Sequence, residues 1–502
     1  MRRRRISCSI ALLALLAAVA CGQKVRQAAV AGPFYPADAN ELRQTVDGFL
    51  AQAAPPAVAG SIVTLIAPHA AHAYSGGVAA HAYALLKGRK PARVVVIAPS
   101  HFDSFAYSAV FSGDAYSTPL GTVPVDTAFA AKLGSMGPLI KLSTRGHVAA
   151  NGHDEHALEV QLPFLQRTLG EFKLVPIIMG DQSYDACRAL GVALAKLIQG
   201  SDTLIIASSD LSHYHTYDDA VKLDRKTLKA ILEWDYFSMS QNFASRVWEA
   251  CGGGPIIAAM IVSERLGATE AKLLKYANSG DVSRERGSVV GYGALALVKA
   301  PAGRAVAAPP FSLTQAERDE LLKLAKTSVE TAVRERRMYD YKGSQSESLM
   351  QERGAFVTLR EKGELRGCIG YVAPLKPLSY AVRDVATDAA LKDGRFPPVT
   401  PGELGQIQYE VSVLSPLRRV LDVKQIEVGK HGLVMRRGES AGLLLPQVPV
   451  EQKWDRMTFL AETCRKAGLP ADAWKDERTD IFMFTALVFG DHTPATATPA
   501  RH

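Results

Sequence analysis

Cysteine is scarce in this chain, and its spacing excludes two common structural roles. Six cysteines are spread over 502 residues, and no two of them form a CxxC pair. They are Cys8, Cys21, Cys187, Cys251, Cys368 and Cys464. Such scattered positions fit neither a disulfide framework nor a zinc knuckle.

A concentrated positive charge is missing as well. The formal net charge is +8, but the segment Arg2–Arg5 supplies part of it. No basic stripe interleaved with aromatic residues occurs in the rest of the chain. We therefore expect no nucleic-acid partner.

The N-terminal apolar run is too short to cross a membrane as a mature helix. It covers Ile10–Val19, follows Arg2–Arg5 and overlaps the small-x-small pattern Ala18–Ala20. This order predicts a signal peptide over residues 1–20 and an exported protein on the periplasmic side. Cys21 comes next and resembles a lipobox cysteine, which predicts that a lipid anchor alone attaches the protein to the membrane. Simple cleavage after Ala20 is the alternative.

Length and composition predict two domains, because 502 residues are too many for one typical domain. Residues 300–311 are rich in Ala and Pro and lack an apolar period. We interpret them as a linker between a domain at 25–299 and a domain at 312–490. The tail at 491–502 is predicted to be disordered.

Strand and helix signals alternate through the first domain, which predicts an α/β fold whose sheet is covered by helices on both faces. The smaller second domain mixes the two types and is predicted to be α+β, beginning with a capping box at Thr314 and Glu317. The predicted strands of the first domain are 61–67, 93–98, 173–179, 203–207 and 288–298. Its predicted helices include 76–87, 155–169, 183–199, 218–232 and 254–266.

Histidines are abundant in the first domain, and several follow the ends of predicted strands. Nine of the chain's 12 histidines lie between His69 and His215. His69, His101 and His213 each follow an apolar strand run. Because the carboxyl ends of parallel strands converge on one crevice, we predict a metal or proton-transfer site there.

The polar residues at these strand ends suit a non-haem iron site. Two imidazoles and an oxygen ligand, with open positions, are the pattern expected of such a site. A further histidine, His156 or His213, would act as acid or base. His156 and Glu159 lie three residues apart and are predicted to share one face of the helix 155–169.

Seven segments of the first domain resemble the Memo family, called system protein B of the AmmeMemoRadiSam group in bacteria. They are VRQAAVAGPFYP, LIAPHAAHAYSGG, VIAPSHF, DEHALEVQLPFL, SSDLSHY, ACGGGP, and NSGDVS with VVGYGA. The resemblance implies the fold of class III extradiol dioxygenases, which open aromatic diols with dioxygen at ferrous iron. It also implies that His69 and His101 are metal ligands and that His156 lies in the same pocket.

The third metal ligand is the point where the chain departs from this family. Some members carry a cysteine ligand in the position where the resemblance places Ser212. Serine is a far weaker ligand than a thiolate, so His213, Asp210 or water are the alternatives.

In the second domain, the segment ELRGCIGY combines a thiol, a cation and two glycines. A thiol beside Arg366 predicts that Cys368 is a nucleophile with a lowered pKa, and His431 is a candidate partner. A buried structural cysteine is the alternative. The residues predicted to line one surface cleft are Arg366, Cys368, Asp393 and Arg395.

Four segments of the second domain resemble the AMMECR-type domain, system protein A of the same group. They are LRGCIG, DGRFPPV, YEVSVLSP and GKHGLV. The resemblance implies a fusion of two proteins that otherwise occur as neighbours. It also implies a radical-SAM protein as a third partner.

These observations favour a metal-binding, dioxygenase-like domain fused to an AMMECR-type domain. We expect a non-haem oxidoreductase with redox or oxygen-dependent chemistry at iron or copper, acting on a small molecule or peptide. One alternative is a non-catalytic binding module that recognises a peptide or a modified partner. Another is an activity of the second domain that depends on Cys368.

Overall fold

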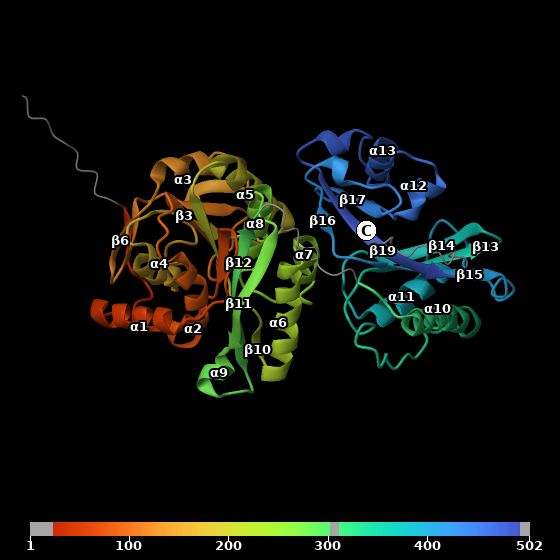
Figure 1. The fold of residues 1–502 in the computed structure, drawn as a ribbon, viewed down its shortest axis with the longest axis horizontal. Coiled ribbons are helices and arrows are strands. Elements are labelled where there is room, and N and C mark those ends of the chain that lie inside the picture. The colour runs from red at the N-terminus through yellow and green to blue at the C-terminus, as the bar shows by residue number, and fades with distance from the viewer. Residues whose placement is uncertain (1–23, 302–310, 492–502) are drawn as a thin grey trace, which may run out of the picture.

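The computed structural model describes residues 24–301 and 311–491, and it shows two domains that lie side by side (Figure 1). The predicted signal peptide, Cys21, most of the predicted linker and the tail from residue 492 lie outside the described residues. Within the two described stretches, no helix combines the length and apolar character needed to cross a membrane.

A nine-stranded sheet forms the centre of the first domain. Its strands are β2 (Ser61–Ala67), β3 (Arg93–Pro99), β4 (Ser108–Phe111), β7 (Ile140–Ser143), β8 (Lys173–Met179), β9 (Thr203–Ser208), β10 (His213–His215), β11 (Glu270–Asn278) and β12 (Val289–Lys299). The order is β10-β12-β2-β9-β3-β8-β4-β7, and β11 pairs with β12. A separate three-stranded sheet contains β1 (Val25–Arg26), β5 (Ala115–Thr118) and β6 (Gly121–Pro124).

The central strands β2, β9, β3 and β8 are parallel, so their carboxyl ends lie at one edge. Strands β12 and β4 run antiparallel on either side of them. The central strands read as nearly continuous apolar runs, such as RVVVIAP in β3, and are almost wholly buried. This pattern is typical of strands covered on both faces, and it explains why the sequence predicted them closely.

Helices cover both sides of this sheet. In Figure 1, α1, α2 and α4 lie on one side of the strands, and α5, α6, α7 and α8 lie on the other. The bounds are α1 (Ala39–Gln52), α2 (His72–Tyr83), α3 (Thr127–Gly134), α4 (Leu162–Leu169), α5 (Tyr184–Ile198), α6 (Tyr217–Leu232), α7 (Tyr236–Ala244), α8 (Gly253–Arg265) and α9 (Ser279–Ser283). The predicted α/β class is confirmed.

The predicted helix at 155–169 begins later than the sequence indicated. A 3-10 turn covers Glu159–Gln161 and α4 follows, so residues 155–158 are not helical. The carboxylate of Glu159 instead accepts hydrogen bonds from the Tyr35 hydroxyl and the Arg26 guanidinium. His156 and Glu159 therefore do not share a helical face, because the buried Glu159 carboxylate is hydrogen-bonded to residues of the N-terminal segment.

The second domain is built on a seven-stranded antiparallel sheet of order β14-β13-β15-β19-β17-β18, with β16 paired to β19. Its strands are β13 (Ala355–Glu361), β14 (Glu364–Tyr371), β15 (Ile407–Leu414), β16 (Arg418–Arg419), β17 (His431–Arg437), β18 (Ser440–Leu444) and β19 (Asp480–Gly490). Its helices are α10 (Gln315–Glu335), α11 (Leu378–Leu391), α12 (Gln447–Glu451) and α13 (Arg456–Lys466). The predicted capping box of Thr314 and Glu317 is present at the start of α10.

Strand β19 holds the two halves of the second sheet together. Its first part pairs with β17 and its last part pairs with β15. The C-terminal strand is therefore central to the domain and not an edge.

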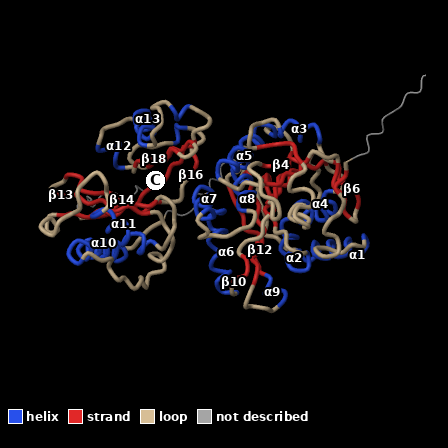
Figure 2. The backbone as a smooth tube through the Cα atoms, turned by 180° about the vertical axis from the view of Figure 1, so that it is seen from behind, coloured by secondary structure: helices blue, strands red, loops and turns tan. Residues whose placement is uncertain are grey.

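The two domains are packed against each other. Figure 2 shows α7 of the first domain beside β16 of the second. The rings of Phe237 and Phe482 lie 5.0 Å apart between centroids. The Asp480 carboxylate, only 2% exposed, accepts from the Tyr184 hydroxyl at 3.0 Å and pairs with Arg188 at 2.6 Å. Apolar packing and a buried carboxylate thus join the domains.

Candidate metal centre

Two strand-end histidines and one cysteine meet at the carboxyl edge of the first sheet. The rings of His69 and His101 lie 5.2 Å apart between centroids, and the Sγ of Cys251 lies 3.0 Å from Nε2 of His69. One donor atom from each of the three residues lies within 4.8 Å of the others. We call His69, His101 and Cys251 the His–Cys group. Its members provide two imidazoles and a thiol, a donor set that suits a transition metal.

The local chain explains how the three residues reach each other. His69 follows β2 and His101 follows β3, and both strands belong to the parallel core. Cys251 stands just before α8, and Gly252 comes next. A Cβ atom on Gly252 would collide with the carbonyl oxygen of Ser208. Glycine is therefore required for the Cys251 loop to approach the end of β9.

A buried serine orients the His69 ring. The Ser208 hydroxyl donates its hydrogen to the Ala157 carbonyl at 2.6 Å. Its oxygen must then accept from Nδ1–H of His69, at 3.0 Å. Nε2 of His69 is consequently left without a proton and faces Cys251. Burial lowers the pKa of His69 well below its usual value, and His101 and His156 lower it further.

A buried carboxylate orients the His101 ring in the same way. Nδ1 of His101 lies 2.9 Å from Oε1 of Glu155, which can only accept, and the His101 backbone N–H donates to Oε2 at 2.7 Å. In the neutral form of the His101 ring, the nitrogen without a proton is then Nε2. Histidine ligands of metals commonly donate their other ring nitrogen to a carboxylate in this manner.

His156 belongs to the same pocket, as the resemblance implied. Its ring stacks on His101 with centroids 4.6 Å apart and on Phe34 at 4.4 Å. Burial, followed by the neighbouring His101, lowers the pKa of His156 to about 4. Its Nδ1 is buried and has no hydrogen-bond partner among the described residues. His156 is therefore a neutral imidazole whose Nδ1 is enclosed by the protein.

Cys251 is the third donor beside the histidines, and the sequence prediction did not include it. The predicted ligand, Ser212, has a buried hydroxyl without a hydrogen-bond partner among the described residues, and its backbone N–H donates to Asp224 at 2.8 Å. The signal that could have identified Cys251 was the segment ACGGGP, in which a thiol precedes three glycines.

The other two candidates for the third ligand have different partners. The Asp210 carboxylate accepts from the His69 backbone N–H at 2.7 Å, and burial raises the pKa of Asp210 to about 7. It supports the turn after β2. The Nδ1–H of His213, the predicted acid or base, donates to the Leu211 carbonyl at 2.9 Å. Burial lowers the pKa of His213, with His101 as a further cause.

In the second domain, three of the predicted cleft residues are joined by hydrogen bonds. The Cys368 N–H donates to Asp393 at 2.8 Å, and Arg395 donates to the Cys368 carbonyl at 3.1 Å and to Asp393 at 2.6 Å. Arg366 is engaged elsewhere, with Glu403 at 2.7 Å.

The predicted lowering of the Cys368 pKa is wrong in direction. Burial raises the pKa of the Cys368 thiol, and Arg395 offsets this only in part. The predicted partner His431 is also misplaced, because its strand β17 is separated from β14 by β13, β15 and β19. Four steps of about 4.8 Å put it roughly 19 Å away.

We expect Cys368 to react slowly with iodoacetamide at pH 7 and considerably faster at pH 9, because its raised pKa leaves little thiolate near neutrality. It should still react faster than Cys464, which is fully buried. Peptide mass spectrometry of native protein after timed labelling measures both rates. A rate at pH 7 that matches a free thiol would contradict the raised pKa.

The fold and the His–Cys group together define the class of the first domain. It is an α/β protein with its candidate site at the carboxyl edge of a mainly parallel sheet. Residues 26–296 match the family model described as "Memo-like protein", and residues 322–489 match "AMMECR1". The chain belongs to the Memo-like family and carries an AMMECR1 domain behind its Memo-like domain. Both resemblances drawn from the sequence are confirmed.

Similar proteins cover the first domain closely. A MEMO1 family protein of Methanosarcina mazei is 39% identical over 279 residues, which is 54% of this chain and 98% of that protein. A MEMO1 family protein of Methanopyrus kandleri is 38% identical over 281 residues, again 54% of this chain and 98% of the relative. Among solved structures, an uncharacterized protein from Pyrococcus horikoshii is 40% identical, covers 35% of this chain and 91% of its own, and has a TM-score of 0.34.

Proposed function

We propose that the first domain binds a transition-metal ion through His69, His101 and Cys251. The observation that carries this proposal is the orientation of the two imidazoles. Ser208 and Glu155 each accept from one Nδ1–H, so the neutral rings have their free nitrogen at Nε2, and one donor atom of each ring lies within 4.8 Å of the Cys251 sulfur. Two imidazole nitrogens and one cysteine sulfur are donor atoms that transition-metal ions commonly bind in proteins.

The donor types narrow the choice of metal. A thiolate disfavours hard ions such as magnesium and calcium, and it suits copper, iron or zinc together with imidazole. Burial raises the pKa of Cys251 well above its usual value, so a bound cation is needed to stabilise the thiolate. Copper and iron are our leading choices, and either would supply redox chemistry when bound.

The surrounding residues determine what else the site does. His156 presents a buried, unpartnered Nδ1, and its imidazole is neutral at pH 7 because its pKa is about 4. It therefore adds no charge to the site at pH 7, and its ring is suited to contact a substrate bound beside the metal. Stacking on Phe34 and His101 fixes the plane of its ring. We propose an oxidoreductase acting on a small organic or peptide substrate.

The test is the metal content and metal affinity of purified protein. Wild type should retain about one copper or iron ion per chain after purification without chelator, measured by elemental analysis. Cys251→Ser and His69→Ala should each weaken binding by more than about 100-fold, because changes of an outer-shell partner alone commonly cost 10- to 100-fold. Glu155→Gln, which leaves all three donors in place, should show this smaller effect.

Cys368→Ser is the matched control, since it removes a part-exposed thiol in the other domain. Its metal content should equal that of wild type. If wild type takes up neither copper nor iron, or if Cys251→Ser binds them as wild type does, the redox proposal fails. Uptake of zinc alone would leave a metal site without redox chemistry.

A further inference from the structure

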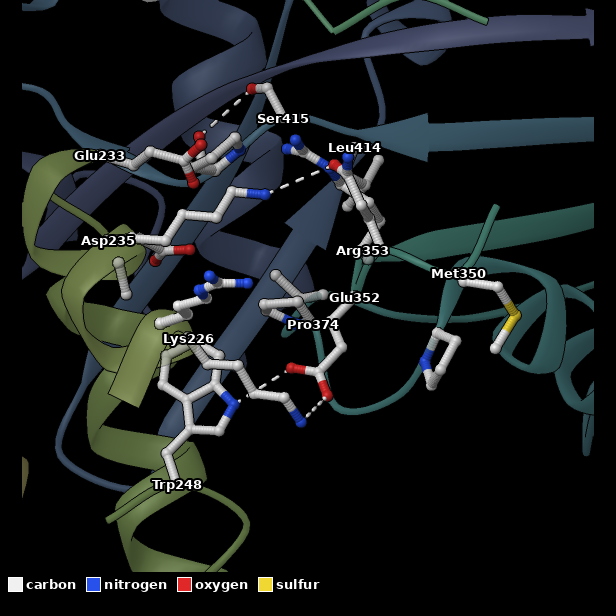
Figure 3. Close-up of a pocket in the computed structure, with 18 residues that line it drawn as sticks. Lys226, Glu233, Asp235, Trp248, Met350, Glu352, Arg353, Pro374, Leu414 and Ser415 are labelled. Carbon is white, nitrogen blue, oxygen red and sulfur yellow. Dashed lines mark hydrogen bonds and ion pairs between the residues drawn. The ribbon is translucent and has the colours of Figure 1, made fainter. Parts of the chain in front are cut away.

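A cavity of about 310 Å³ lies between the two domains (Figure 3), and its lining includes no member of the His–Cys group. Helix α6 and the segment around α7 form one wall, and three segments of the second domain form the other. This volume is at the lower end of the range that holds small organic ligands.

Much of the cavity wall is apolar. The first domain contributes Trp248, and the second contributes Val372, Pro374 and Leu414. Trp248 is 5% exposed and its ring borders the cavity (Figure 3). Such a wall suits the hydrocarbon part of a ligand, since burial of apolar surface drives its binding.

Hydrogen bonds between the domains hold the cavity in shape. Glu352 accepts from Lys226 Nζ at 2.6 Å and from Trp248 Nε1 at 3.1 Å. Lys229 Nζ lies 3.4 Å from Oε1 of Gln351. In Figure 3, the bonds of Lys226 and Trp248 to Glu352 cross from one domain to the other. Each carboxylate oxygen of Glu352 thus accepts one hydrogen bond across the interface, whereas Lys229 makes one long hydrogen bond.

Arg353 is a buried cationic group of the cavity that has no carboxylate partner among the described residues. Its residue is 9% exposed, and its Nε has no hydrogen-bond partner within the described part of the chain. No carboxylate of the described residues lies within 4.0 Å of its guanidinium, which stacks on the Phe311 ring at 4.4 Å. A buried cation without a partner is costly, so an anionic ligand would relieve it.

The two remaining carboxylates of the cavity lie across from Arg353. Figure 3 shows Glu233 and Asp235 on the wall formed by the first domain. Asp235 is engaged as the N-cap of α7, where it accepts from the Ser238 N–H at 3.1 Å. The negative charge of the Asp235 carboxylate would repel a second negative charge on a ligand. The cavity therefore suits a ligand with a single negative charge and an apolar body.

We propose that this cavity binds a small organic monocarboxylate, whose carboxylate pairs with Arg353 and whose apolar body lies against Trp248, Pro374 and Leu414. Guanidinium and carboxylate match in geometry and form charge-assisted hydrogen bonds. Because both domains line the cavity, the bound ligand would also strengthen their association. The proposal is independent of the metal site.

The probe is 2-naphthoate, with 2-naphthalenemethanol as its uncharged counterpart. Equilibrium dialysis against full-length protein, read by naphthalene fluorescence, gives the affinity of each. We expect one naphthoate site per chain and a preference over the alcohol on the order of 10- to 100-fold, the value of a hydrogen-bonded charge pair. Equal binding of acid and alcohol to wild type overturns the proposal, and this comparison needs no variant.

Variants locate the site. Arg353→Met should remove the preference for the acid, and Arg353→Lys, which keeps the charge, should retain part of it. Lys196→Met is the matched control: it breaks an exposed pair with Glu477 between the domains but leaves the cavity intact, so binding should not change. If naphthoate binding is lost in Cys251→Ser and kept in Arg353→Met, the acid binds at the His–Cys group and the cavity proposal is wrong.

Discussion

Glu159→Ala is expected to lower the free energy of unfolding by about 3 to 5 kcal/mol, the usual cost of removing one partner of a buried ion pair. The side chain of Glu159 is fully buried and that of Arg26 is 5% exposed. The carboxylate also accepts from the Tyr35 hydroxyl and from the backbone N–H groups of Ala29 and Val30 at 3.0 to 3.1 Å. The substitution removes the counter-ion of Arg26 and leaves the buried Tyr35 hydroxyl and Val30 N–H without their acceptor.

The effect should extend to the candidate metal centre. Arg26 also donates to the Glu155 carbonyl at 2.6 Å, and Glu155 holds the ring of His101. Loss of the carboxylate frees Arg26 and loosens this support. We therefore expect weaker metal binding in Glu159→Ala, although none of the proposed ligands is changed.

Denaturant unfolding followed by circular dichroism measures the stability change. Glu41→Ala is a suitable control, because Glu41 is exposed in the first turn of α1 and should cost less than about 1 kcal/mol. The double variant Arg26→Met/Glu159→Ala should lose less than the sum of the single losses, since the cation is then absent. A loss below about 1 kcal/mol in Glu159→Ala would contradict the importance of the buried pair.

Asp480→Ala should have a comparable effect at the domain interface, about 3 to 5 kcal/mol. Its carboxylate pairs with Arg188 of the first domain at 2.6 Å and with Arg419 of its own domain at 3.1 Å. Without it, two part-buried guanidinium groups lose the carboxylate between them. We expect the wild type to unfold in one transition and Asp480→Ala to unfold in two, because the domains of the variant lose their coupling.

Differential scanning calorimetry distinguishes coupled from separate unfolding. The control is Glu477→Ala, whose partner Lys196 is half exposed; such a pair contributes no more than about 1 kcal/mol. Its transition should remain single and nearly unshifted. If Asp480→Ala behaves like Glu477→Ala, the domains are held by apolar packing around Phe237 and Phe482 and not by the carboxylate.

The sequence predicted the sheet better than the site. Continuous apolar runs such as those of β2 and β3 are typical of strands buried on both faces of a sheet. The carboxyl ends of these parallel strands then place His69 and His101 near each other. Strand order follows no such local rule, because it depends on contacts between distant segments. The helix predicted at 155–169 failed for the same reason: Glu159 is bound by residues more than 120 positions away.

Cys251 shows the same limit at the site. It stands 182 positions from His69 and reaches it only because Gly252 permits a close approach to Ser208. No periodicity signals such a contact. The cavity around Arg353 was equally beyond sequence reasoning, since its walls are surfaces of two separate domains.

The positions of β12 and β19 also constrain the order in which the protein folds during synthesis. Strand β12 is inserted between β2 and β11 in the first sheet, and β19 joins β15 to β17 in the second. Each is the last strand of its domain within the described residues, so neither sheet is complete until that strand has left the ribosome. The first domain completes its sheet while the second is still being translated, and the apolar surface around Phe237 stays exposed until Phe482 emerges. A chaperone that binds nascent chains would find its substrate in that interval.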